Sequence, residues 1–421
     1  MRDRARFARP LGVRGPYALV TLNPPEIIST STTMSTRPTL ELIRRAVVAA
    51  AVVTRAVQSR LAAADRFSKL DESPVTIADL AAQAVVVHAL TRALGTRFAI
   101  VGEESSAMLR AGPASLRAAT VAAARLGWSV AGGDGRGGCA TEGPGPTEDE
   151  MLAAIDLGAA APPDGAGSFF TLDPIDGTKG FIRGHQYAVC LAFIECGQPT
   201  MAALACPNLS ANFLQPFTSP DAVGTLFLAE AVAGHEAMSA AAPGPPGLRA
   251  FMATCEADAP LHKLAPAARE AGAPLRFCQS FDPAHSDHST TARLIERLRA
   301  RGVQAGRPAQ LDSQAKYGVL ARNQADVLVR RPQTLRRDYI WDVAPGALIA
   351  QAAGFKVTDS AGAALDFTHG TTLKLNDGIL AARPADHTRI LAELSVLPRP
   401  GMGRTAARGG GILPGAPASS S

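Results

Sequence analysis

The chain opens its first predicted domain with a long helical pattern. Apolar side chains recur every three or four residues from Leu40 through Ile43 and Val47 to Leu61, which predicts a helix that ends near Ala64. Arginines at positions 44, 45 and 55 flank the alanine and valine run near residue 50. This run is therefore predicted to be an amphipathic helix of a soluble protein and not a membrane span.

A second helix is predicted from Leu80 to Leu94, a stretch that is rich in alanine and has neither glycine nor proline. A loop from Ser68 to Pro74 separates it from the first helix. Asp79 falls at or near the start of the second helix, where the helix dipole favours a carboxylate. It is either a plain helix cap or a functional acid.

Short apolar runs predict several strands in the rest of the first half. The runs 187–194 and 200–206 flank the turn Gly197-Gln198, so they predict a hairpin that is buried on both faces. The Ala, Pro and Gly run 240–247 predicts a boundary between two halves, and 132–147 reads as a surface loop. The predicted strands cover 98–101, 168–172, 187–194, 200–206 and 226–231.

The second half alternates helical and strand patterns, which is typical of an α/β arrangement. A strand is predicted over 249–254 and another over 325–330, with helices over 260–271, 290–301, 315–321 and 347–353. The predicted organisation is an N-terminal α+β metal-binding subdomain (36–240) and a C-terminal α/β subdomain (248–396), flanked by an extension (1–35) and a disordered tail (397–421).

The most informative stretch is the corner from Asp173 to Gly180, which follows the predicted strand 168–172. Its two carboxylates, Asp173 and Asp176, stand three residues apart, and Pro174 and Gly177 favour a tight turn around them. Oxygen ligands of this kind suit hard cations such as magnesium. The backbone N–H groups of Gly177 and Thr178, at the start of a following helix, could hold a phosphate. The alternative is an ordinary Asp-Pro and Asp-Gly turn.

Two further acids lie at comparable places. Glu103 follows the predicted strand 98–101, and Asp342 precedes the predicted helix 347–353, with Pro345 at a position that suits the first helical turn. Considered alone, Glu103 is a solvated loop acid and Asp342 a helix cap. Together with the first corner they indicate a site for metal and phosphate.

Charge and cysteine content exclude some classes of protein. The formal net charge is +5, with +3 in residues 1–34 and +3 in residues 396–421, so the body carries 5 − 3 − 3 = −1. A body of this charge argues against a protein that grips nucleic acid through a basic face. The six cysteines show neither C-x-x-C pairs nor zinc spacing, which favours a reducing compartment.

The first 34 residues contain five arginines and only two acids, and Ser and Thr follow from Ser29. This composition is typical of an organellar transit peptide. A start at Met34 is equally compatible with the sequence. The expected location is the chloroplast or mitochondrion in the first case and the cytoplasm in the second.

Three segments taken together resemble the signature of the lithium-sensitive, magnesium-dependent phosphatase superfamily that includes inositol monophosphatase. They are Gly102-Glu103-Glu104, Asp173 to Thr178 and Trp341 to Gly346. Longer strings resemble its 3′(2′),5′-bisphosphate nucleotidase branch: SPVT (73–76), DPIDGTKGFIRG (173–184), QYAVCL (186–191), CPNL (206–209) and LDSQAKY (311–317). The resemblance covers about residues 38–395 and implies a layered α-β-α-β-α sandwich with two subdomains.

The resemblance implies roles for individual residues. Two or three magnesium ions would be held by Glu103, Asp173, the Ile175 carbonyl, Asp176 and Asp342, while Asp79 and Thr178 would hold and deprotonate the attacking water. The nucleotide pocket would comprise Gly177, Thr178, His285, Ser313, Lys316, Arg330 and Asp342. Three positions depart from the family pattern and bear on the shape of the pocket: Ala284, Val343 and Pro345.

The implied activity is that of a metal-dependent phosphomonoesterase. It would release the 3′-phosphate of 3′-phosphoadenosine 5′-phosphate, with the 5′-phosphosulfate as a further candidate substrate, and act in sulfur assimilation without nucleic-acid or membrane partners, as a monomer or homodimer. The rivals are an inositol monophosphatase, an inositol polyphosphate 1-phosphatase and a catalytically silent nucleotide-binding protein. Lys316 and Arg330 favour the nucleotidase, because a second phosphate that is not hydrolysed needs fixed cations.

Overall fold

The computed structural model describes residues 38–64, 73–132, 145–159, 161–162, 167–232, 247–266, 269–270, 272–282, 287–331 and 337–398. The residues from Pro38 onward form one compact unit. The predicted N-terminal extension, the loop 133–144 and the tail from residue 399 lie outside the described residues.

The described residues alternate between helices and strands along most of the chain. The helices are α1 (Leu40–Ala64), α2 (Ser73–Leu94), α3 (Ala107–Ala111), α4 (Ala114–Gly132), α5 (Glu148–Leu157), α6 (Thr178–Ile182), α7 (His288–Ala300), α8 (Ala315–Ala321), α9 (Ala344–Ala352) and α10 (Pro384–Ser395). The strands are β1 (Ala99–Gly102), β2 (Ser168–Asp176), β3 (Ala188–Glu195), β4 (Gln198–Cys206), β5 (Thr225–Ala231), β6 (Leu248–Thr254), β7 (His262–Leu264), β8 (Phe277–Gln279), β9 (Ala309–Gln310), β10 (Val327–Arg330), β11 (Lys356–Thr358) and β12 (Ile379–Ala382).

The strands form two sheets. The larger sheet has seven strands in the order β1 to β7, and β1 and β2 are its one parallel pair among the described residues. The smaller sheet has five strands in the order β11-β12-β10-β8-β9. In it, β8 runs parallel to β9 and β10, and β12 runs antiparallel to β10 and β11.

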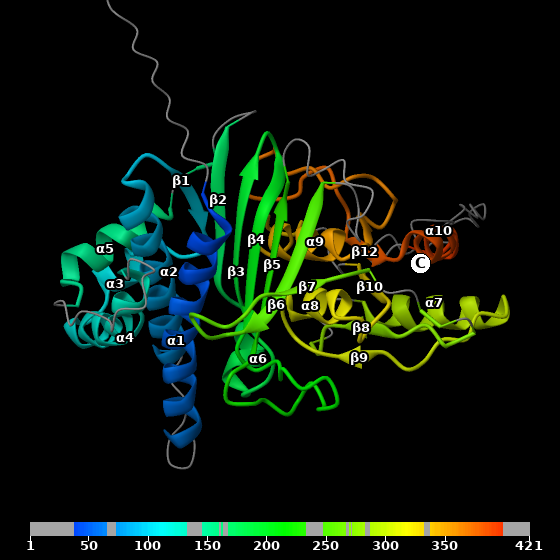
Figure 1. The fold of residues 1–421 in the computed structure, drawn as a ribbon, viewed down its shortest axis with the longest axis horizontal. Helices are drawn as coiled ribbons and strands as arrows, with labels where there is room; N and C mark the ends of the chain where they lie inside the picture. Colours follow the sequence, from blue (N-terminus) through cyan, green and yellow to red (C-terminus); the bar gives the residue numbers. More distant parts are fainter. Residues whose placement is uncertain are drawn as a thin grey trace, which may run out of the picture. The chain divides into compact units, whose positions relative to one another are not determined.

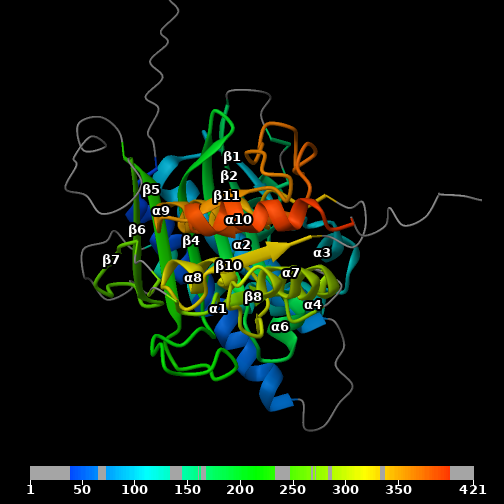
Figure 2. The same ribbon diagram turned by 90° about the vertical axis from the view of Figure 1, so that its right-hand side faces the viewer.

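The helices and sheets stack in layers (Figure 1). Helices α1 and α2 cover one face of the larger sheet, and α8 and α9 pack between the two sheets. Helices α7 and α10 cover the outer face of the smaller sheet, which faces the viewer in Figure 2. This α-β-α-β-α order confirms the fold class predicted from the sequence.

Strand β3 shows why strands of the larger sheet have continuous apolar sequences. Its residues alternate between two hydrophobic cores: Val189 and Leu191 face α1 and α2, whereas Cys190 and Ala192 face the layer of α8 and α9. Because helices cover both faces of the sheet, both sets of side chains are buried. The predicted hairpin of β3 and β4, buried on both faces, is therefore confirmed.

Two sequence predictions are wrong in detail. Helix α2 begins at Ser73, since Pro74 is tolerated in a first helical turn, so Asp79 lies inside the helix rather than at its start. Residues 262–264 form β7 and pair with β6, where a helix was predicted over 260–271. Pro266 removes a backbone donor from that segment, which disfavours a helix.

Most of the predicted boundary at 240–247 lies outside the described residues. Strands β6 and β7 follow it in sequence but complete the larger sheet, and β6 pairs antiparallel with β5 across this segment.

One helical segment of the described chain, Thr76–Leu94, has the length and hydropathy of a membrane span. Its most apolar window is 67% buried inside the protein, by α1, α4 and the larger sheet among others. A core helix of a layered protein is buried in this way. Composition alone therefore does not distinguish a core helix from a membrane span.

Candidate active site

The corner after β2 holds two acids in place through its backbone. The pairing of β2 with β3 shifts register between Asp173 and Asp176, which bends the strand end. Asp173 Oδ1 accepts a hydrogen bond from Ile175 N at 3.0 Å. Gly177 has a φ of 88°, and a Cβ added there would lie 2.9 Å from the Cβ of Ser313. Both conditions restrict this position to glycine.

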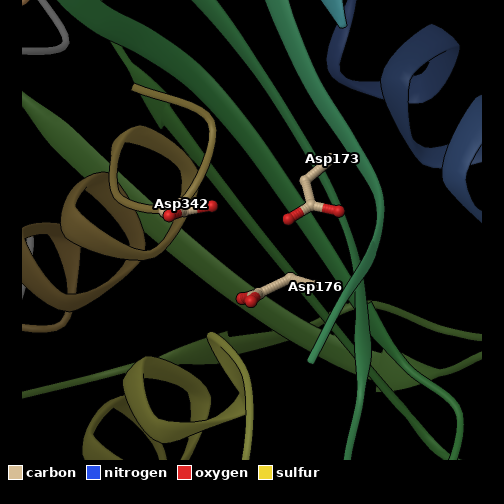
Figure 3. A group of neighbouring side chains, drawn as sticks. All are labelled: Asp173, Asp176 and Asp342. Atoms are coloured by element: carbon tan, nitrogen blue, oxygen red, sulfur yellow. The ribbon is translucent and has the colours of Figure 1, made fainter. Parts of the chain in front are cut away.

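Asp342 joins these two acids from a distant part of the chain. It lies in the turn before α9, where its backbone N–H donates to Tyr339 O at 3.2 Å. Carboxylate oxygens of Asp173, Asp176 and Asp342 lie within 4.8 Å of one another. Figure 3 shows the three side chains grouped in one space, two from the end of β2 and one from the turn that precedes α9.

Parallel pairing of β1 and β2 brings in a fourth acid. Gly102 is paired with Leu172, and Glu103 N donates to Leu172 O at 3.1 Å, so Glu103 leaves its strand beside Asp173. Its negative charge, together with burial, holds the pKa of Asp173 well above the usual value. Asp79, buried within α2, lies near this group: burial raises its pKa, and the charges of Glu104 and Glu103 raise it further.

The crowding of these carboxylates has an electrostatic cost. Burial raises the pKa of Asp342 to about 7, although Arg330 acts in the opposite direction. Like charges at this separation disfavour ionisation unless cations accompany them. The ligand atoms are all oxygens, the donor type that magnesium prefers over softer metals. The residues present therefore fit the metal that the resemblance implies.

One cavity of about 270 Å³ connects these acids to a group of polar and basic residues. We call Glu103, Asp173, Asp176 and Asp342 the acid end, and Ser313, Lys316 and Arg330 the cationic end. The volume is close to that of sites for small molecules. The cavity wall contains these predicted residues: Glu103, Asp173, Ile175, Asp176, Gly177, Thr178, Ser313, Lys316, Arg330 and Asp342.

The cations of the cationic end are held by the chain itself. Lys316 is 6% exposed, and its Nζ donates to Ser313 O at 2.7 Å and Leu311 O at 3.3 Å. Arg330 forms an ion pair with Asp338 at 2.7 Å and a longer one with Asp342 at 3.7 Å. Although burial alone would lower it, these acids hold the pKa of Arg330 above its usual range. Both side chains therefore stay fixed at the cavity wall.

The structure places two predicted residues differently from the rest. Asp79 and Thr178 were expected to act together on the attacking water, but the Thr178 hydroxyl donates its one proton to Ile175 O at 3.4 Å. Among the described residues, no hydrogen bond joins Thr178 to Asp79, and Asp79 is not one of the residues that line the cavity. His285 lies outside the described residues.

Sequence reasoning missed several residues of the cavity. Gln314 connects the acid end to the turn before α9, and Asp338 holds Arg330. Lys179 pairs with Asp282 at 2.5 Å, and both contribute to the wall. The signal available for Gln314 was its position inside the string 311–317, but its hydrogen-bond partners lie far away in sequence.

Comparison with known families agrees with this site. The inositol monophosphatase family model matches residues 147–398, which include the corner after β2, the cationic end and Asp342. The chain belongs to the inositol monophosphatase family.

Two relatives that the chain matches over most of its length carry the same name. The 3′(2′),5′-bisphosphate nucleotidase of Schizosaccharomyces pombe is 36% identical over 345 residues, covering 81% of this chain and 89% of that protein. The protein of the same name from Oryza sativa is 37% identical over 347 residues, with coverage of 81% and 89%. Among solved structures, Mycobacterium tuberculosis SuhB matches at 16% identity and a TM-score of 0.48, covering 85% of this chain and 95% of SuhB.

Proposed function

We propose that this protein is a magnesium-dependent 3′(2′),5′-bisphosphate nucleotidase that converts 3′-phosphoadenosine 5′-phosphate to AMP and phosphate. The observation that carries the proposal is one cavity whose wall holds four acids together with two cations, the buried Lys316 and the half-buried Arg330. A substrate with two phosphates needs both ends, one for the phosphate that leaves and one for the phosphate that stays.

At the acid end, Glu103, Asp173, Asp176, Asp342 and the Ile175 carbonyl would hold the metal. When bound, magnesium supplies an activated water and stabilises charge on the phosphoryl oxygens. Asp79 would take the proton of the attacking water, because burial raises its pKa and makes it a stronger base than an exposed aspartate. The Thr178 hydroxyl would give up its hydrogen bond to the Ile175 carbonyl and bind that water instead, which would orient the water.

At the cationic end, Lys316 and Arg330 would hold the phosphate that is not hydrolysed, with Ser313 as a further donor. The ammonium group of Lys316 has three N–H donors, and two of them bind the carbonyls of Leu311 and Ser313. The third N–H can donate to a phosphate. Because burial and these bonds already fix the ammonium group, little side-chain entropy is lost on binding.

The names of the relatives support this substrate, and the fixed cations favour it over an inositol monophosphate. The test is phosphate release from 3′-phosphoadenosine 5′-phosphate, AMP and inositol 1-phosphate, measured side by side with magnesium. We expect the first substrate to have the highest kcat/KM. A preference for inositol 1-phosphate would move the assignment to the inositol phosphatases, and binding of nucleotide without phosphate release would make the chain a silent binding protein.

A further inference from the structure

Gln314 makes three hydrogen bonds that join separate segments of the active site. Its backbone N–H donates to Asp176 Oδ2 at 2.5 Å. Its side-chain Nε2 donates to Trp341 O at 2.8 Å, and its Oε1 accepts from Gly346 N at 2.9 Å. The side chain is buried, with 2% of the residue exposed. One residue therefore contacts both corners that carry the acid end.

The bond to Gly346 serves the start of α9. The first N–H groups of a helix have no partner within it, and side chains commonly accept hydrogen bonds from them. The N-cap residue of α9 is Val343, which makes no side-chain cap. Oε1 of Gln314 replaces that cap from another segment, and Nε2 simultaneously holds the carbonyl that directly precedes Asp342.

An amide is the side chain that these contacts require. The site needs a donor toward Trp341 O and an acceptor toward Gly346 N on the same group, and the glutamine amide offers both on one carbon. A methionine of similar length offers neither. The hydrogen bond from the Gln314 backbone to Asp176 does not depend on the side chain. A substitution at Gln314 therefore removes the bonds to Trp341 and Gly346 and keeps the bond to Asp176.

We infer that Gln314 is a positioning residue that fixes Asp342 at the separation from Asp176 that metal binding needs. The inference rests on the proposed function, since it concerns the metal site of that reaction. Gln314 itself contributes no ligand. It acts by holding the turn from Trp341 to Gly346 against the corner after β2, as residues behind metal ligands commonly do.

The test is magnesium binding to Gln314→Met, measured by isothermal titration calorimetry with magnesium chloride alone. Loss of such a supporting contact typically weakens metal affinity roughly 10- to 100-fold, and we expect a loss in this range. At saturating magnesium, the KM for 3′-phosphoadenosine 5′-phosphate should change less than the magnesium affinity, because the hydrogen bonds of Lys316 and the ion pair of Arg330 with Asp338 do not involve the Gln314 side chain. Gln314→Ala gives a second variant that also keeps the backbone bond to Asp176.

The matched control is Asn376→Ala. Asn376 is also a buried amide, 4% exposed, that donates to Ala364 O at 2.8 Å and accepts from Asp366 N at 2.8 Å, away from the cavity. The Asn376→Ala variant should have a lower melting temperature than the wild type and an unchanged affinity for magnesium. Wild-type affinity in folded Gln314→Met or Gln314→Ala would overturn the inference and leave the proposed function standing. A wild-type protein that binds no magnesium would instead refute the proposed function.

Discussion

The acid end and the cationic end of the cavity differ in how their charges are balanced. At the acid end, Asp173, Asp176 and Asp342 bring carboxylate oxygens within 4.8 Å of one another, and burial and mutual repulsion raise the pKa of Asp173. At the cationic end, Lys316 is held by two backbone carbonyls and Arg330 by two carboxylates. The protein thus pairs both cations with its own oxygen atoms, whereas the three carboxylates crowd one another and Arg330 lies 3.7 Å from Asp342.

This difference indicates what each end does. A group of crowded acids is stabilised by external cations, so the acid end is suited to bind metal. Fixed cations with spare donors are suited to bind an anion without rearrangement, so the cationic end is organised before substrate arrives. The ion pair from Arg330 to Asp342 at 3.7 Å links the two ends.

Removal of metal should have the largest effect. Excess chelator should abolish phosphate release, because the acid end cannot stabilise the charges of the reaction alone, and added magnesium should restore it. Phosphate release with and without chelator measures this. Full activity in excess chelator would mean that the acid end is a structural cluster and that the comparison of the two ends is mistaken.

Asp176→Asn should come next. Loss of one ligand charge removes several kcal/mol of stabilisation, so we expect kcat to fall at least about a thousandfold. The fold should persist, since an asparagine oxygen can still accept the bond from Gln314 N. The control is Asp221→Asn, which alters a loop aspartate that accepts from Gly224 N outside the cavity. Wild-type turnover of Asp176→Asn would show that the corner after β2 is an ordinary turn without a role in metal binding.

Lys316→Ala should have a smaller and selective effect. Loss of one charge-assisted hydrogen bond costs about 1.5 to 3 kcal/mol, which corresponds to a fall in kcat/KM of roughly ten- to a hundredfold. The fall should appear with 3′-phosphoadenosine 5′-phosphate and be nearly absent with inositol 1-phosphate, which has no second phosphate. Equal falls for both substrates would show that Lys316 supports the segment of Leu311 and Ser313 through its two carbonyl bonds, and not the nucleotide.

The two ends also differ in how well sequence predicts them. The corner from Asp173 to Thr178 is local: proline, glycine and two acids within a few residues determine the turn, so its shape could be predicted. The link from Gln314 to Asp176 spans 138 residues, and no periodic pattern indicates such a contact. Arg330 and Asp338 are close in sequence, but their pairing could not be predicted either, because it depends on how the end of β10 lies against the turn before α9.

The fold shows the same division. Helix α1 was predicted with its observed bounds, because a long periodic pattern dominates its sequence. Strand β7 was missed, since its three residues are held by pairing with β6 rather than by their own propensities. Local signals therefore locate the long elements and the chemistry, while tertiary pairing decides the short elements and the contacts that position the site.

The smallest expected effect concerns pH and the acid end. Burial raises the pKa of Asp342 from 3.8 to about 7, against the opposing effect of Arg330. Between these values the folded, metal-free protein holds a proton that the unfolded chain has lost. The free energy of unfolding of the metal-free protein should therefore fall as pH rises across this window.

Magnesium needs the ionised carboxylate, so its binding must expel that proton below about pH 7. We expect the rise in melting temperature caused by magnesium to increase from about pH 5.5 to about pH 7 and then to level off. Per proton, affinity can change at most about tenfold for each pH unit. If the rise in melting temperature caused by magnesium is independent of pH, then Arg330 already keeps Asp342 ionised. The charges of the two ends would then be balanced by each other and not within each end.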